Sequence, residues 1–283
     1  MYRFWLFALF ALAWFDETCG TKAAQPLHST FLSDVFQSQE QHDSKHFRVR
    51  QVPGDGGCLF HALTVCLDYC HSSKHCDFGS AQRRISNQIR RLAVDLLQRG
   101  NDTFVMDNKE TIPSSQLLAV VADHYNMTTE EYCRKMVQPS TWGGGPEIVA
   151  ICNHLKRPIH VYELSGTEAT DAAQNKLQQK VPLGTHQFKL CAKFGSPTFD
   201  KKSPLHILCA DGRFPDVDPR EAKKVGDHFL ALFPCDGYGN IVSQSLPERL
   251  EEEERRWWKE LSEPNKSEPS GLRGWSQRWR GGK

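Results

Sequence analysis

The chain has 283 residues, of which 39% are hydrophobic and 24% are charged. A chain of this length can bury a core as one large domain or two small ones, and its composition excludes a disordered chain and a protein with many membrane spans. Its 35 basic and 34 acidic side chains give a net charge of +1. Because no global positive field results, we expect no nucleic-acid partner.

The first residues differ from this average. Arg3 precedes an apolar run from Phe4 to Phe15, after which acidic and small residues follow. A helix of that length reaches roughly 18 Å, which is short of the ~30 Å hydrocarbon core of a bilayer. The pattern predicts a signal peptide or a short apolar anchor over residues 1–24 and a linker over 25–45. An apolar helix docked on the domain is the alternative.

The expected location follows from this segment and from the glycosylation sequons. Three asparagines lie in such sequons, namely Asn101, Asn126 and Asn265. Both features favour the secretory pathway or an organelle reached through it. A cytoplasmic or membrane-anchored protein is the alternative.

Residues 46–236 are predicted to form one domain. Alternating polarity predicts a strand over 46–52, and a glycine turn over 53–57 precedes a helix that starts at Cys58. Helical spacing and capping signals predict helices at 80–98, 115–124, 128–137 and 147–155. Short apolar runs predict strands at 159–164, 187–191, 205–209 and 228–233. This order indicates an α/β (α+β-like) fold with a mixed central β-sheet flanked by helices.

The composition changes again over residues 246–283. Glu251 to Glu254, followed by two arginines, predict a charged and solvated helix. The residues from Pro264 onward are basic, contain tryptophans and have few aliphatic side chains, which predicts a disordered tail. Membrane contact through the termini and a loosely docked tail both fit this composition.

Cys58 follows the glycine turn Gly54-Asp55-Gly56-Gly57. A helix start offers unpaired amides and a positive dipole end, which favour a thiolate, and glycines let backbone amides approach a developing oxyanion. These features predict a nucleophile. A buried structural thiol after a tight turn is the alternative.

His228 begins the apolar run that ends at Phe233. A rigid strand can fix an imidazole at the edge of a sheet, so His228 is the candidate base for Cys58. Without that pairing, a structural histidine is the more common interpretation.

Three motifs resemble those of the ovarian tumour (OTU) family of cysteine proteases, which cleave ubiquitin from proteins. The Asp-Gly-x-Cys-Leu-Phe signature of the family is met by Asp55, Gly56, Cys58, Leu59 and Phe60. Its Trp-Gly-Gly segment before a helix with an early glutamate is met by Trp142 and Glu147, and its histidine–aromatic pair by His228 and Phe229.

The resemblance implies a thiol-dependent deubiquitinase of OTU type that acts on ubiquitin or ubiquitinated proteins and needs no cofactor. Cys58 then attacks the carbonyl carbon of the terminal glycine of ubiquitin, and His228 accepts the thiol proton. Asp55 is the signature acid, which either orients the histidine or holds the oxyanion loop. The oxyanion site and its wall are formed by Gly56, Gly57 and Trp142.

One position departs from the family pattern. Members commonly carry Asp or Asn two residues after the histidine, and Leu230 stands there in this chain. A second hypothesis is therefore a catalytically weak or inactive protein of OTU fold that binds ubiquitin or acts as a scaffold. The ten cysteines support a third hypothesis, a secreted cysteine-rich interaction protein.

A group of potential metal ligands lies just after Cys58. It comprises Cys66, Cys70, His71, His75 and Cys76. Two pairs are spaced four residues apart and share a helical face if the helix persists, so zinc could use four of them. The spacing matches no common zinc-finger pattern, which favours a surface turn with incidental ligands.

Overall fold

The computed structural model describes residues 31–39, 46–107, 109–165, 186–218, 221–223, 226–236, 238–242 and 248–263. The predicted signal peptide or anchor at 1–24 and the tail from residue 264 lie outside these ranges and stay predictions. Within them, no helix is long and apolar enough to cross a membrane.

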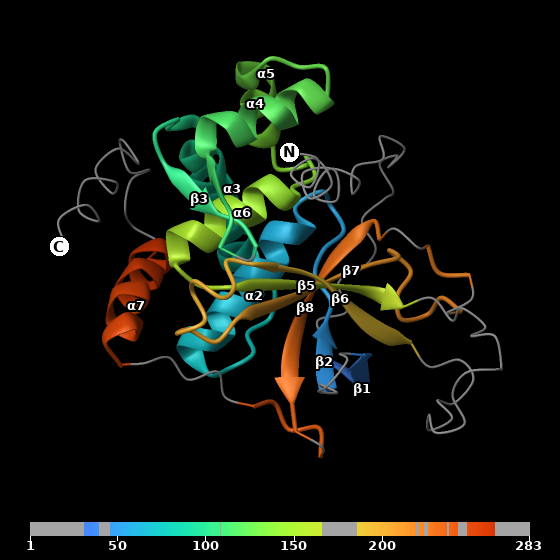
Figure 1. Ribbon diagram of the computed structural model, residues 1–283. Coiled ribbons are helices and arrows are strands. Elements are labelled where there is room, and N and C mark those ends of the chain that lie inside the picture. The colour runs from blue at the N-terminus through green and yellow to red at the C-terminus, as the bar shows by residue number, and fades with distance from the viewer. Residues whose placement is uncertain are drawn as a thin grey trace.

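Six strands of the described chain form a closed barrel in the order β1, β2, β8, β7, β5, β6 (Figure 1). Their bounds are Phe31–Gln39 (β1), His46–Arg50 (β2), Ile159–Ser165 (β5), Gln187–Phe194 (β6), Leu205–Ala210 (β7) and His228–Cys235 (β8). β1 runs parallel to β6 and β5 to β7, whereas the other neighbours are antiparallel. The predicted mixed sheet is confirmed, but its closure was not predicted, because β1 lies within the expected linker.

The helices gather on one side of the barrel. Their bounds are Cys58–Ser72 (α2), Ser80–Gln98 (α3), Ser114–His124 (α4), Thr129–Met136 (α5), Gly145–Leu155 (α6) and Glu248–Ser262 (α7). α2 packs against β8 and β7, and α3 packs on α2 and α6 (Figure 1). A small two-stranded sheet, Thr103–Val105 (β3) and Thr111–Pro113 (β4), lies beside α6.

Strand β8 contributes to two hydrophobic cores. Phe229 and Ala231 face the core that lies between the sheet and the helices, whereas Leu230 and Leu232 belong to the second core, within the barrel. Successive side chains of a strand point to opposite faces, so one apolar run serves both cores. His228 is the first residue of this doubly buried strand, so its backbone is fixed by the register with Ala210 of β7.

Helix α7 confirms the predicted charged helix but corrects the prediction that it is solvated. Glu254, Trp257 and Trp258 are 3%, 5% and 6% exposed. The Glu254 carboxylate binds Arg157 Nη1 at 2.8 Å and Lys202 Nζ at 2.7 Å. Cationic side chains that are distant in sequence therefore dock the helix on the domain. The charge pattern of the helix alone does not indicate these partners.

Candidate functional site

Cys58 is the first residue of α2, directly after the glycine turn. Its side chain is 1% exposed. Within the turn, Gly56 has φ +82°, and a Cβ atom there would lie 2.0 Å from the Ser140 carbonyl oxygen. Only glycine fits this left-handed backbone and this close approach. The turn is therefore pressed against the segment that precedes Trp142.

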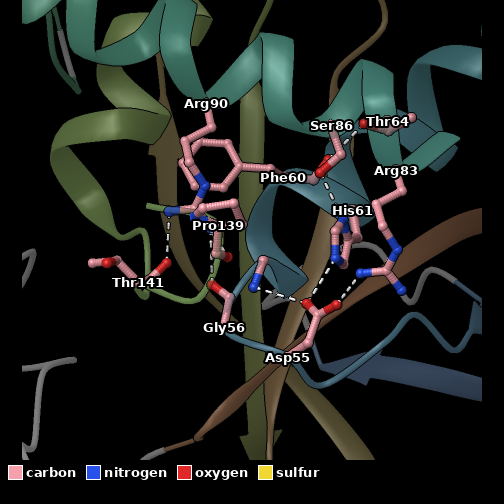
Figure 2. Close-up of polar contacts among 11 residues, drawn as sticks. Asp55, Gly56, Phe60, His61, Thr64, Arg83, Ser86, Arg90, Pro139 and Thr141 are labelled. Atoms are coloured by element: carbon pink, nitrogen blue, oxygen red, sulfur yellow. Dashed lines mark hydrogen bonds and ion pairs between the residues drawn. The ribbon is translucent and has the colours of Figure 1, made fainter. Parts of the chain in front are cut away.

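Arg90 of α3 fastens these two segments to each other (Figure 2). Its buried guanidinium donates to the carbonyls of Gly56 (3.1 Å), Pro139 (2.9 Å) and Thr141 (2.6 Å). Its Cζ atom also lies 4.3 Å from the centre of the Phe60 ring. Burial lowers the pKa of Arg90 to about 10, so it remains a cation at neutral pH. Several charge-assisted bonds from one fork fix the relative position of the two segments.

Asp55 binds the turn and two side chains, none of which is His228. Oδ1 accepts from the Gly57 amide at 3.1 Å and lies 2.8 Å from His61 Nε2, and Oδ2 pairs with Arg83. Burial opposes ionisation, but the hydrogen bonds from His61 and Arg83 hold the pKa of Asp55 well below its usual value. Of the two predicted roles, the geometry supports holding the oxyanion loop.

His228 faces the start of the same turn. A Cβ atom at Gly54 would lie 3.6 Å from His228 Cε1, and the imidazole donates a hydrogen bond to the Val52 carbonyl. The side chain is 7% exposed, and burial lowers its pKa to about 4. The imidazole is therefore neutral at pH 7, as a general base must be.

The candidate nucleophile Cys58 and the candidate base His228 lie on backbone segments that contact each other. The amide of Phe229, the residue after His228, donates a hydrogen bond to the Cys58 sulfur. Burial raises the pKa of the Cys58 thiol to about 12, although the Phe229 and Leu59 amides favour the thiolate. Desolvation therefore outweighs the effect of the two amides, and burial favours the thiol over the thiolate in the resting site.

No carboxylate or amide stands two residues after His228, where members of the family commonly carry one. Leu230 is fully buried in the barrel core. The Asp227 carboxylate accepts from the Gly212 amide at 2.5 Å and pairs with Lys223. Asp227 therefore acts on the imidazole only through its charge, which raises the pKa of His228 against the effect of burial.

Trp142 and Glu147 support the site from the helix side. Trp142 is half-buried and packs against the core that lies between the sheet and the helices. Glu147 is fully buried, where it accepts from the Tyr132 hydroxyl at 2.7 Å and the Gly144 amide at 2.8 Å. The second sequence motif thus caps α6 and anchors the segment that Arg90 holds.

Comparison with known protein families identifies this arrangement. The family described as OTU-like cysteine protease matches residues 53–198, which contain the turn, Cys58 and the segment around Trp142. The chain belongs to this family.

Three curated relatives of this OTU chain are similar over part of their length. They are the ubiquitin thioesterase otu2 of Schizosaccharomyces pombe (28% identical over 118 residues), the OVARIAN TUMOR DOMAIN-containing deubiquitinating enzyme 4 of Arabidopsis thaliana (30% over 116) and the deubiquitinase OTUD6B of Xenopus laevis (25% over 150). The matches cover 41%, 39% and 52% of this chain. The chain spans 32%, 29% and 42% of these relatives.

Solved OTU domains are also similar. An OTU domain in complex with ubiquitin is 14% identical, with 77% of this chain and 86% of that chain covered and a TM-score of 0.36. The Hazara virus OTU bound to ubiquitin is 17% identical, with 71% and 96% covered and a TM-score of 0.38. At these scores, the fold assignment rests on the family match and on the strand order itself.

The potential zinc ligands of the OTU chain have separate partners. Cys66 donates to the His206 carbonyl at 3.4 Å, and Arg157 Nη2 lies 3.3 Å from the Cys70 sulfur. Among the described residues, no group of three or more His, Cys, Asp or Glu side chains is arranged to hold a metal ion. Cys66, Cys70 and His71 belong to α2, so the predicted surface turn begins only after Ser72.

A polar face of α3 holds the turn, and this face was not predicted from the sequence. Arg83, Ser86 and Arg90 all point toward the Cys58 turn (Figure 2). Their spacing of three and four residues places them on one face of the helix. That pattern was visible in the sequence, but nothing local indicated which carbonyls and carboxylates would meet it. His61, which lies one turn after Cys58 on α2, is a partner of Asp55 that was not predicted.

Proposed function

We propose that the chain is a thiol-dependent deubiquitinase, which hydrolyses the isopeptide bond after the C-terminal glycine of ubiquitin. One observation carries the proposal: the Cys58 sulfur, at the start of α2, accepts a hydrogen bond from the amide that follows His228. Family membership supports the proposal, as do the names of the curated relatives.

In the first step, the Cys58 sulfur attacks the carbonyl carbon of the ubiquitin glycine while its proton passes to the His228 imidazole. The carbonyl π electrons move to the oxygen, which becomes an oxyanion. The Gly57 amide already donates to Asp55. The Cys58 amide belongs to the first turn of α2, where amides have no intrahelical acceptor, so it is the better candidate for the oxyanion donor.

In the second step, the oxyanion collapses and the C–N bond breaks. The imidazolium of His228 gives its proton to the leaving lysine amine, which leaves a thioester on Cys58. Water then attacks the thioester and gives a proton to His228, and the C–S bond breaks. The sulfur takes back this proton, which restores the thiol and frees the ubiquitin carboxyl group.

A catalytically weak or inactive ubiquitin-binding protein is the second candidate. The thiol pKa of about 12 and the imidazole pKa of about 4 oppose proton transfer in the resting site. Leu230 also supplies no polar group to orient the ring. These observations favour slow turnover.

Hydrolysis of ubiquitin that carries a fluorogenic amide at its C-terminus distinguishes the two candidates. We expect the full chain, purified under reducing conditions, to release the fluorophore. Cys58→Ala removes the nucleophile and abolishes release, whereas Cys66→Ala alters another buried cysteine of the same helix and retains it. A wild-type chain that binds ubiquitin but releases nothing contradicts the proposal and supports the second candidate.

A further inference from the structure

His61 lies one turn after Cys58 on α2 and is 2% exposed. Both of its ring nitrogens have side-chain partners (Figure 2). Nε2 lies 2.8 Å from Asp55 Oδ1, and Nδ1 lies 2.6 Å from Ser86 Oγ of α3. The three side chains form a continuous hydrogen-bonded chain from α3, through α2, to the turn before Cys58, in which Ser86 and His61 are buried and Asp55 is partly exposed.

The direction of these hydrogen bonds follows from their partners. An ionised carboxylate only accepts, so His61 Nε2 donates to Asp55. Burial lowers the pKa of His61, although Asp55 opposes the shift, so the ring is neutral and Nδ1 accepts from the Ser86 hydroxyl. Ser86 is 1% exposed and holds a single tautomer of the ring, so it is not a second nucleophile.

The chain ends on the Gly57 backbone. Asp55 Oδ1, which accepts from His61, also accepts the Gly57 amide at 3.1 Å. The Gly57 carbonyl accepts the His61 amide at 2.9 Å as the first bond of α2. A Cβ atom at Gly57 would lie 2.6 Å from His61 Nε2, so the ring packs directly against this residue. Both sides of Gly57 are thus tied to His61, and the next amide along the chain is that of Cys58.

We propose that His61 is a positioning residue for the oxyanion site: through Asp55 it fixes the Gly57 backbone and so aims the Cys58 amide at the developing oxyanion. This role rests on the proposed function, because it matters only if Cys58 attacks a carbonyl. His61 acts through other groups and does not touch the substrate.

A pair of substitutions separates the hydrogen bond from the bulk of the ring. His61→Gln places an amide NH₂ near the position of Nε2 and can still donate to Asp55. His61→Leu fills a similar space without a donor. Ser86→Ala is a milder variant, since it removes only the partner of Nδ1. Thr64→Val is the matched control, because Thr64 is also buried on α2 and its hydroxyl donates to the Phe60 carbonyl at 2.7 Å.

Two reactions with ubiquitin distinguish a loss of oxyanion stabilisation from a general loss of folding, ubiquitin binding or thiol reactivity. Hydrolysis of a C-terminal amide passes through an oxyanion. Ubiquitin that ends in a bromoethyl amide alkylates Cys58 by displacement: the S–C bond forms, bromide leaves, and the thiol proton passes to His228 without an oxyanion. Both reactions need ubiquitin binding, Cys58 and His228, and only the first needs the aimed amide.

We expect His61→Leu to lower kcat for hydrolysis by about 10- to 100-fold, less than the about 10²- to 10³-fold lost with an oxyanion donor itself. Its alkylation rate should stay within about threefold of wild type, because displacement forms no oxyanion to stabilise. His61→Gln and Thr64→Val should retain most of the hydrolysis rate, and Ser86→Ala should lose a smaller share than His61→Leu.

Three results overturn the proposal. The first is an unchanged kcat in both His61→Leu and Ser86→Ala. The second is an equal loss of hydrolysis and alkylation in His61→Leu. The third is a loss of hydrolysis in Ser86→Ala that is fully explained by a lower melting temperature of that variant. A wild-type chain that neither hydrolyses nor alkylates contradicts the proposed function instead, and the positioning role then falls with it.

Discussion

The turn before Cys58 is held by side-chain hydrogen bonds, whereas His228 is held by strand register and packing. Asp55, His61 and Arg90 tie the turn to α3 and to the segment before Trp142. The strand that begins at His228 pairs with β2 and β7 and sits in two hydrophobic cores. A single polar substitution should therefore disturb the cysteine side, whereas the histidine side should respond to changes in packing.

The largest expected effect is that of His228→Ala on turnover. We expect kcat for ubiquitin-amide hydrolysis to fall by about 10³-fold or more, because the thiol then has no base. Asp55→Ala should lose less, about 10- to 100-fold, because its partners hold the turn and not the imidazole. Steady-state kinetics of both variants, with the exposed His124→Ala as control, checks this order. An equal loss in the two variants would show that Asp55 orients the ring after all.

Gly56→Ala should damage the cysteine side more than Gly54→Ala. The new methyl group at residue 56 meets the Ser140 carbonyl and a left-handed backbone, which together cost about 2 to 5 kcal/mol. At residue 54 the methyl group makes an ordinary contact with His228. Urea unfolding of both variants measures the difference. Equal stabilities would contradict the close approach of the two segments.

Leu230→Asn tests whether the histidine side depends on packing. Burying an amide in the barrel core should lower the free energy of unfolding by about 2 to 3 kcal/mol. We expect no gain in kcat, since the His228 ring already donates to the Val52 carbonyl. Leu230→Met conserves volume and should cost less than about 1.5 kcal/mol. A rise in kcat for Leu230→Asn would mean that the ring lacks an orienting partner.

The smallest expected effect is on the pH dependence of stability. Burial lowers the pKa of His228 from its usual 6.5 to about 4, so between these values the unfolded chain binds the proton and the folded chain does not. Stability from this group is present above pH 6.5 and is lost as the pH falls toward 4. Between pH 7 and 5 the loss should be about 2 kcal/mol larger in wild type than in His228→Gln. Urea unfolding at both pH values checks this, and parallel curves would contradict the burial of a neutral ring.

Much of the fold was visible in local patterns. The helix at 80–98 and the strands that start at 159, 187, 205 and 228 have the predicted starts, because capping residues and apolar spacing act within a few residues. Strand β1 was missed because, besides the nearby β2, it pairs with β6, which lies far along the chain. The docking of α7 was missed for the same reason, since the partners of Glu254 are Arg157 and Lys202.

Some features of the candidate site could likewise be predicted from local sequence, whereas others depend on distant residues. The motif around Cys58 and the strand start at His228 could be located from sequence, and the structure brings their backbones together. The protonation states could not be predicted, because they depend on burial: desolvation opposes both the thiolate and the imidazolium. The roles of His61 and Arg90 depend on carbonyls and carboxylates that only the folded chain brings within reach.

Covalent labelling tests the central claim most directly. Ubiquitin with an electrophile at its C-terminus, added to the full chain under reducing conditions, should form one adduct, which peptide mass spectrometry should locate on Cys58. Cys58 is the cysteine that receives the amide next to the candidate base, so the other nine of the ten should stay unlabelled. A chain that binds this ubiquitin without forming an adduct, or that forms it on another cysteine, contradicts the account.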